Sequence, residues 1–158
     1  MTGRLFAVVG PSGAGKDTLI AAAAAARPAL HVVRRVITRP EAAGGEPFEG
    51  VSPTEFAARA ARGAFALTWD AHGLSYGIPA TIDAALAAGR DVVFNGSRAV
   101  LEQAAARYPG LAVLHVTAPV PVLAARLAAR GRETAGDIAA RLVGYNTDVD
   151  GFLAALDA

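Results

Sequence analysis

The chain has 158 residues, of which 53% are hydrophobic and 18% charged, and its formal net charge is +1. This length and apolar content suit a single globular domain over residues 1–158. Because the net charge is close to zero and the arginines are spread along the chain, a nucleic-acid-binding surface is not expected. No apolar run reaches the roughly 18 residues of a membrane span, so a membrane is not an expected partner either.

The sequence contains no cysteine, which excludes disulfides and thiolate metal sites. The N-terminus enters an apolar, strand-like run at once, without the features of a signal peptide. We therefore expect a cytoplasmic protein.

The first predicted elements enclose a glycine-rich segment. An apolar run over residues 5–9 is followed by Gly10-Pro11-Ser12-Gly13-Ala14-Gly15-Lys16-Asp17-Thr18 and a helix-forming stretch over 16–26. A strand, a glycine-rich turn and a helix in this order predict a phosphate-binding loop. Backbone N–H groups and the helix N-terminus would converge on a phosphate, and Lys16, the only lysine, would add a full charge. The alternative, an ordinary strand-to-helix turn, fits the motif less well.

The residue after Lys16 departs from the usual Ser or Thr of such loops. It is Asp17, and Thr18 follows. The hydroxyl that helps to hold Mg²⁺ is therefore displaced by one residue or replaced by a carboxylate. We expect Asp17 or Thr18 to approach the metal or its waters.

Strand-like and helix-forming stretches alternate along the rest of the chain. The strands are expected at 32–37, 64–69, 92–94 and 111–116, and the helices at 54–62, 80–88, 99–107 and 120–129. This alternation predicts an α/β fold of three layers, in which a parallel sheet is covered by helices on both faces.

Two groups of polar residues follow the strands expected at 32–37 and 64–69. In Thr38-Arg39-Pro40, the proline holds Arg39 extended, so its guanidinium can reach across a cleft and grip phosphate oxygens in pairs; a solvated arginine is an equally good interpretation. Residues 69–79 are expected to form a loop at the carboxyl end of a strand, where ligand sites lie in such folds. The loop offers Asp70, His72 and Tyr76 as contacts, although an isolated histidine is most often only solvated.

A third group, Asn95-Gly96-Ser97-Arg98, follows the strand expected at 92–94. Ser97 suits a helix N-cap, a structural role that competes with ligand binding. Arg98 at a helix start opposes the helix dipole, a placement that a nearby anion would rationalise. Asn95, Ser97 and Arg98 are therefore candidate substrate-binding residues.

Three arginines, Arg126, Arg130 and Arg132, lie near or beyond the end of the helix expected at 120–129. The first two share one helix face because they are four residues apart. Basic residues are common at helix ends. Gly131 supplies a hinge, however, which makes a lid over about 130–143, closing on a transferring phosphoryl group, an equally good interpretation.

These motifs resemble those of the guanylate kinase-like P-loop kinases, and in particular the ribose 1,5-bisphosphate phosphokinases of bacterial phosphonate metabolism. Residues 10–18, 37–40, 73–77, 94–98 and 126–133 carry the resemblance. It implies an enzyme that uses ATP and Mg²⁺ to convert a sugar phosphate, ribose 1,5-bisphosphate, to 5-phosphoribosyl 1-pyrophosphate. It also implies a small acceptor-binding insertion at about 32–78, whose strands need not join the main sheet.

The resemblance further implies a role for each group of residues. Lys16 and Mg²⁺ would neutralise the β and γ phosphates, and the three arginines at 126, 130 and 132 would close over the γ phosphate as catalytic residues. Arg39, Tyr76 and Arg98 would hold the acceptor. Since the attacking oxygen belongs to a phosphate that is already ionised, no general base is expected.

Guanylate kinases typically carry a second arginine after the Thr-Arg-Pro motif, then a phosphate-binding tyrosine and a guanine-reading aspartate. The corresponding positions hold Ala42, no tyrosine near Phe48, and Asn95, which favours a sugar phosphate over GMP. Two alternatives stay open: a guanylate kinase, and a nucleotide-binding protein without turnover. The second arises because no apolar run of strand length follows residue 143, so the adenine pocket would be weakened or completed by another subunit in a homodimer.

Overall fold

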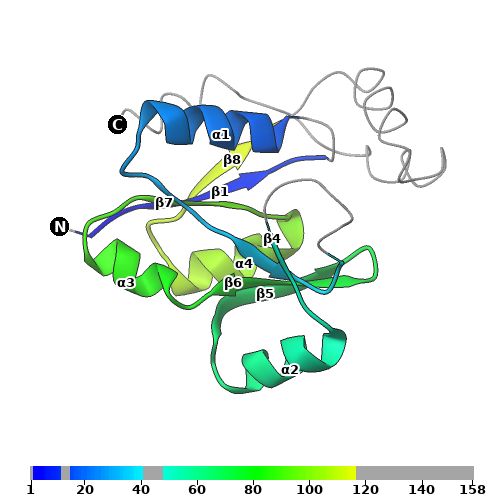
Figure 1. Cartoon of the computed structure of the whole chain (residues 1–158). Helices are drawn as coiled ribbons and strands as arrows, with labels where there is room; N and C mark the ends of the chain where they lie inside the picture. The colour runs from blue at the N-terminus through cyan, green and yellow to red at the C-terminus, as the bar shows by residue number, and fades with distance from the viewer. Residues whose placement is uncertain (1, 12–14, 41–47, 117–158) are drawn as a thin grey trace.

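The computed structural model describes residues 2–11, 15–40 and 48–116 (Figure 1). The strands are β1 (Leu5–Val9), β2 (His31–Val32), β3 (Arg35–Ile37), β4 (Phe48–Gly50), β5 (Phe65–Ala71), β6 (Leu74–Pro79), β7 (Val92–Asn95) and β8 (Ala112–His115). The helices are α1 (Lys16–Ala26), α2 (Pro53–Ala61), α3 (Ile82–Ala87) and α4 (Arg98–Arg107). The helix expected at 120–129 and the lid at about 130–143 lie outside the described residues.

The first sheet, sheet A, has the strand order β2-β7-β1-β8, and all its neighbouring strands are parallel. Successive residues of β1 pack on opposite faces, as the alternation of side chains in a strand requires. Phe6 and Val8 join a cluster with Ile20 of α1, whereas Leu5 and Ala7 join a cluster with α3 and α4. The predicted three-layer α/β fold is therefore confirmed, with α1 on one side of the sheet and α3 and α4 on the other (Figure 1).

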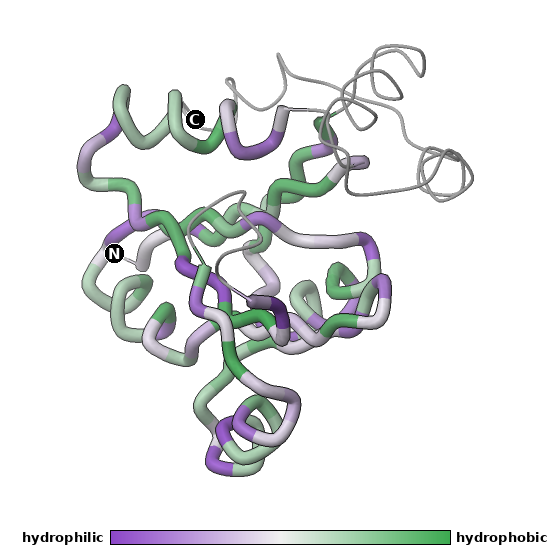
Figure 2. Tube along the Cα trace, turned by 45° about the vertical axis from the view of Figure 1, so that its right-hand side comes forward, coloured by the Kyte–Doolittle hydropathy of each residue, from purple (hydrophilic) through white to green (hydrophobic). Residues whose placement is uncertain are grey.

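The apolar strands run through the centre of the molecule, where Figure 2 shows them in green. Helix α1 is pale along most of its length because alanines form much of it. Alanine favours the helix and lets it approach the sheet closely. None of the helices in the described part of the chain has the length and apolar character needed to cross a lipid bilayer.

The second sheet, sheet B, has the order β4-β3-β6-β5, with β3 parallel to β4 and antiparallel to β6. The single strand predicted at 32–37 is wrong, because the chain changes sheets within it. Val32 pairs with β7 in sheet A, while Arg35–Ile37 forms β3 in sheet B. Strands β4 and β6 were not predicted from the sequence.

The loop predicted at 69–79 is also wrong: these residues form most of an antiparallel hairpin of β5 and β6. Its two-residue turn is His72-Gly73, with φ angles of 53° and 76°. Positive φ at both central residues matches the twist of the flanking strands. An added Cβ at Gly77 of β6 would lie 2.7 Å from the Phe65 ring, so close packing across the hairpin requires glycine there.

Sheet B is attached to sheet A and its helices by two kinds of contact. Trp69 of β5 is 7% exposed, and its ring lies 6.5 Å from that of Phe94 in β7. The side-chain amide of Gln103 in α4 accepts from the Thr68 N–H and donates to the Thr68 carbonyl, both at 3.1 Å. These contacts fix the hairpin against the layer that carries α4.

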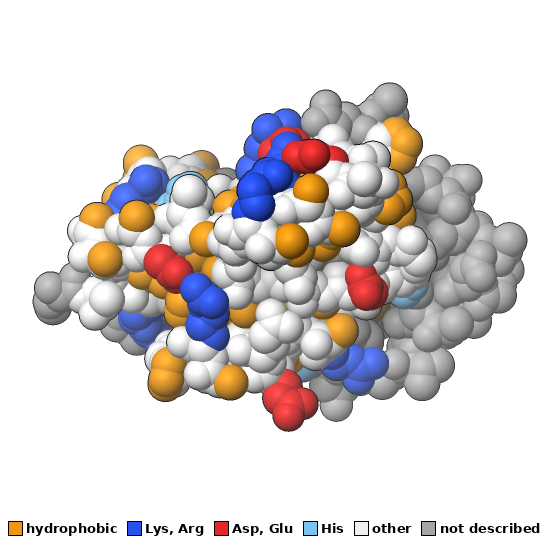
Figure 3. Space-filling model, turned by 90° about the horizontal axis from the view of Figure 1, so that it is seen from below, with side chains coloured by type: hydrophobic (Ala, Val, Ile, Leu, Met, Phe, Trp, Pro, Cys, Tyr) orange, Lys and Arg blue, Asp and Glu red, His pale blue; other side chains and the backbone are white. Residues whose placement is uncertain are grey.

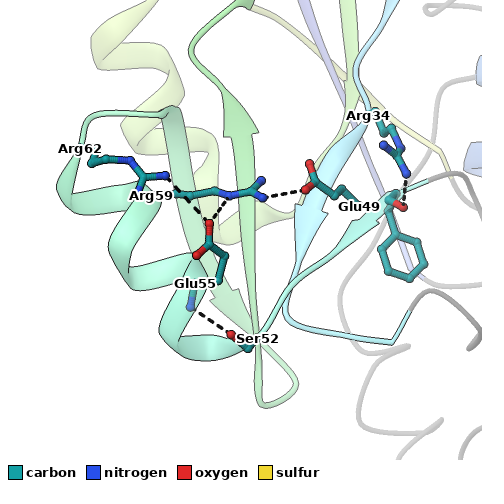
Figure 4. A network of polar contacts seen from close by, with 7 residues as sticks. Arg34, Glu49, Ser52, Glu55, Arg59 and Arg62 are labelled. Atoms are coloured by element: carbon teal, nitrogen blue, oxygen red, sulfur yellow. Dashed lines mark hydrogen bonds and ion pairs between the residues drawn. The ribbon is translucent and has the colours of Figure 1, made fainter.

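An ionic network joins α2 to β4 on the outer side of sheet B (Figure 4). Arg59 contacts Glu49 at 2.8 Å and Glu55 at 2.9 Å, and the Arg59 hydrogen bond lowers the pKa of Glu49. Ser52 caps the helix by accepting from the Glu55 N–H at 3.0 Å. Elsewhere on the face seen in Figure 3, acidic and basic side chains are interspersed among uncharged ones.

Candidate active site

The described part of the glycine-rich segment comprises residues 10 and 11 after β1 and the residues from 15 onward at the start of α1. At Gly10 an added Cβ would lie 2.0 Å from the carbonyl oxygen of Val116, so this close approach of two backbones permits only glycine. Gly15 is the N-cap of α1 and has a φ of 99°, a left-handed conformation that side chains disfavour. Glycine is therefore required at position 10 and favoured at position 15, while Ser12, Gly13 and Ala14 lie outside the described residues.

Lys16 and Asp17 lie in the first turn of α1. The ammonium of Lys16 donates to the Gly10 carbonyl at 2.7 Å, which holds it beside the end of β1. Asn95, at the end of β7 and 7% exposed, donates from its amide to Oδ1 of Asp17 at 2.9 Å. Because β7 and β1 are parallel neighbours, their carboxyl ends bring these two residues together.

The Asp17 carboxylate has the chemistry to bind Mg²⁺ together with phosphate oxygens. No group of three or more His, Cys, Asp or Glu side chains in the described residues could hold a metal by itself. Mg²⁺ is usually bound by one or two carboxylates together with substrate phosphates. The Asp17 carboxylate, oriented by Asn95 and exposed beside the loop, fits that pattern.

On sheet B, aromatic rings and arginines lie together on one face. Tyr76 of β6 stacks on Trp69 of β5, with ring centroids 5.2 Å apart and planes 6° apart. The guanidinium of Arg35 in β3 lies 5.2 Å from the centre of the Tyr76 ring. Arg39 lies 4.4 Å from the ring of Phe48. Of the residues nominated from the sequence, Tyr76 of sheet B and Arg39, two residues beyond β3, therefore lie near an arginine that was not nominated.

Burial and three neighbouring groups together lower the pKa of Arg35 to about 10. Loss of solvation is the largest cause, and Arg39 also lowers the pKa, whereas Tyr76 and Asp17 raise it. At that pKa the guanidinium is still a cation at neutral pH. Arg35 is thus electrostatically linked to the first turn of α1 as well as to Arg39. No motif in the sequence marks Arg35, because its place beside Tyr76 depends on the pairing of β3 with β6.

The structure separates the remaining nominated residues from this face. Asp70 accepts from the Ser75 hydroxyl at 2.7 Å, and since it neighbours Trp69 in the strand, its side chain lies on the opposite face of the sheet. His72 is exposed at the hairpin turn. Ser97 is the N-cap of α4, where its hydroxyl accepts from the Ala99 N–H at 3.3 Å. Arg98 is exposed at the first position of α4, and Arg126, Arg130 and Arg132 lie outside the described residues.

Comparison with known proteins identifies the family. No family model matches the chain. The chain is, however, 57% identical over 147 residues to the ribose 1,5-bisphosphate phosphokinase PhnN of Pseudomonas fluorescens, a match that covers 90% of this chain and 76% of that protein. The chain belongs to the ribose 1,5-bisphosphate phosphokinase family. This confirms the resemblance drawn from the motifs.

Further relatives agree with this family. The PhnN of Rhizobium etli is 54% identical, over 89% of this chain and 73% of that protein. A bifunctional ribose 1,5-bisphosphokinase-thymidine phosphorylase of Cupriavidus necator is also 54% identical, but the chain spans only 24% of its length. Among solved structures, a guanylate kinase from Anaplasma phagocytophilum superposes with a TM-score of 0.71 at 15% identity, covering 99% of this chain and 85% of that one. The last match supports the guanylate kinase-like fold alone.

Proposed function

We propose that this protein transfers the γ-phosphoryl group of ATP to ribose 1,5-bisphosphate, giving 5-phosphoribosyl 1-pyrophosphate and ADP. The observation that carries the proposal is the family membership at 57% identity. The geometry supports it, since a glycine-shaped loop with Lys16 lies on sheet A and an arginine-bearing face lies on sheet B. A cytoplasmic location and a homodimer stay predictions.

The reaction requires the protein mainly to align the two substrates and to neutralise the charge of their phosphates. An oxygen of the acceptor's 1-phosphate forms a bond to the γ phosphorus, while the bond from that phosphorus to the β–γ bridging oxygen breaks. The bridging oxygen keeps the electron pair and leaves as part of ADP. Because the attacking oxygen is already ionised near neutral pH, no side chain has to remove a proton.

The residues of the loop would bind the nucleotide. Backbone N–H groups of residues 10–18 and the N-terminus of α1 would hold the phosphates, and Lys16 would leave the Gly10 carbonyl to bind the β and γ oxygens. Asp17, oriented by Asn95, and Thr18 would hold Mg²⁺. When bound there, Mg²⁺ neutralises charge on the β and γ phosphates.

The acceptor would lie between the loop and sheet B. Arg39 and Tyr76 would bind it there, with Arg98 at the start of α4 as a further phosphate-binding residue. Arg126, Arg130 and Arg132 are proposed to neutralise the γ phosphate in the transition state. Asp70, His72 and Ser97 are weaker candidates, because their described positions are a cross-strand pair, an exposed turn and a helix cap.

The test is ADP release from ATP with each of two acceptors, ribose 1,5-bisphosphate and GMP, followed by mass spectrometry of the product. The proposal expects ADP with the sugar bisphosphate and a product one phosphoryl group heavier. ADP release with GMP alone would establish a guanylate kinase instead. Tight ATP binding without transfer to either acceptor would indicate a nucleotide-binding protein that lacks turnover.

A further inference from the structure

Arg35 is held in place on the face of sheet B that also bears Tyr76. Three neighbouring strands contribute to this part of the face. Tyr76 of β6 pairs with Trp69 of β5, and Arg35 of β3 lies diagonally from Tyr76, whose direct partner in β3 is Ile37. The guanidinium lies 5.2 Å from the Tyr76 ring centre, and that ring stacks on Trp69. Trp69 is in turn buried at 7% exposure. A cation supported by a packed aromatic row keeps its position at little entropic cost when a ligand binds.

A second guanidinium acts on Arg35 in this partly buried region. Among the groups whose charges affect Arg35 are Asp17, Arg39 and the phenol of Tyr76. Arg39 and Asp17 act on it in opposite directions. The carboxylate of Asp17 is also bound by the Asn95 amide at 2.9 Å, which divides its hydrogen-bonding capacity. Bound phosphate oxygens would relieve the repulsion between the two arginines, and a guanidinium can bind them in pairs.

The acceptor of the proposed reaction carries two phosphates, one more than a nucleoside monophosphate. Beside sheet B, the guanidinium of Arg39 can bind only one of them well, and Arg98 lies apart from that face at the start of α4. Resting on the proposed function, we propose that Arg35 is a further phosphate-binding residue of the acceptor site, and that Arg35 and Arg39 together select a sugar bisphosphate over a monophosphate. Arg35 thus contributes to specificity as well as to affinity.

The experiment is calorimetric titration of ribose 1,5-bisphosphate and of ATP into the wild type, Arg35→Met and a matched control. The control is Arg34→Met, which removes the same charge one residue away. The Arg34 side chain donates to the Phe48 carbonyl at 3.2 Å (Figure 4) and has no role in the proposed site. Arg35→Met should weaken binding of the sugar bisphosphate by about 10- to 100-fold, the effect of losing a charge-assisted hydrogen bond. ATP binding should stay within about twofold, as should all binding by Arg34→Met.

Ribose 1-phosphate and ribose 5-phosphate, titrated in the same way, identify the phosphate concerned. Arg35→Met should lose affinity for one of the two monophosphates and keep its affinity for the other. Unchanged affinity for the bisphosphate and both monophosphates overturns the inference, and so does an equal loss in Arg34→Met. If Arg35→Met does not fold, Arg35→Lys decides, because it keeps the charge and loses the paired geometry: bisphosphate affinity equal to the wild type overturns the inference.

The outcome for the wild type separates this inference from the proposed function. If the wild type binds ribose 1,5-bisphosphate and Arg35→Met binds it equally well, only the role of Arg35 is refuted. A wild-type protein that binds ATP but no ribose 1,5-bisphosphate would refute the proposed function and this inference with it.

Discussion

Replacing Asn95 by aspartate tests the contact that joins β7 to the phosphate-binding loop. In the protein the Asn95 amide donates to Oδ1 of Asp17 at 2.9 Å. In Asn95→Asp the donor becomes a second carboxylate at the same distance. Two unit negative charges 2.9 Å apart repel by about 6 kcal/mol at an effective dielectric constant of 20. The variant cannot keep both carboxylates ionised without a large loss of stability.

Uptake of a proton is the cheaper way to remove this repulsion. Protonating a carboxyl group with a reference pKa of about 3.9 costs about 4 kcal/mol at pH 7 and about 2 kcal/mol at pH 5.5. Both values lie below the repulsion of about 6 kcal/mol, so the folded variant shares one proton between its two carboxyl groups. We therefore expect Asn95→Asp to lower the free energy of unfolding by about 4 kcal/mol at pH 7 and about 2 kcal/mol at pH 5.5.

The sign follows from proton binding. Between about pH 4 and 7 the folded variant holds one proton that its unfolded chain has released, so its stability falls as pH rises. Urea unfolding of the variant and the wild type at both pH values measures the difference. Asn95→Leu is the control: it loses the hydrogen bond without adding charge and should cost about 1–2 kcal/mol at either pH. Equal stability of Asn95→Asp and wild type at pH 7, or the same pH dependence in Asn95→Leu, would refute the reasoning.

Four further substitutions test other parts of the structure. Lys16→Ala should reduce ADP release at least about a hundredfold with unchanged circular dichroism, and normal turnover would mean that the phosphate site lies elsewhere. Gly10→Ala places a Cβ 2.0 Å from the Val116 carbonyl oxygen and should lower the free energy of unfolding by about 3 kcal/mol or more. Gly15→Ala has open space around its Cβ and should lower it by about 1 kcal/mol. Thermal unfolding of both variants measures this, and a larger loss of stability in Gly15→Ala would contradict it. Tyr108→Phe removes a hydrogen bond to Asp83 and should cost about 1 kcal/mol. Burial, followed by that hydrogen bond, raises the pKa of Tyr108 to about 12. The difference in the free energy of unfolding between wild type and variant should therefore be complete below pH 10 and vanish as the pH rises to 12. A constant difference across that range would contradict this prediction.

The sequence predicted best where the determinants are local. Strand β1 and helix α1 have the expected bounds, because an uninterrupted apolar run meets glycines and then alanines. The three-layer fold followed from the alternation of strands and helices. The run at 32–37 was misjudged, since it carries no glycine or proline to mark the change of sheet; only the separate pairing partners of β2 and β3 divide it. The β5–β6 hairpin was missed because its turn is His-Gly, without the Asn or Asp that usually precedes glycine there.

The candidate site could be predicted only in part, for a related reason. Lys16 and Arg39 stand in motifs that are recognisable by themselves. The contact of Asn95 with Asp17 joins residues 78 positions apart, and it depends on β7 lying beside β1, which the sequence does not specify. Arg35 went unrecognised because its position on the face of Tyr76 has meaning only once β3 is known to pair with β6.

The two hydrogen bonds between the Gln103 side chain and the Thr68 backbone affect self-association. Strand β5 is an edge strand of its sheet among the described strands, and edge strands readily pair with a strand of another molecule. One glutamine amide occupies the donor and the acceptor that an incoming backbone would need at this position. The same side chain that aligns the hairpin with its neighbouring helix therefore also protects the protein against edge-to-edge aggregation.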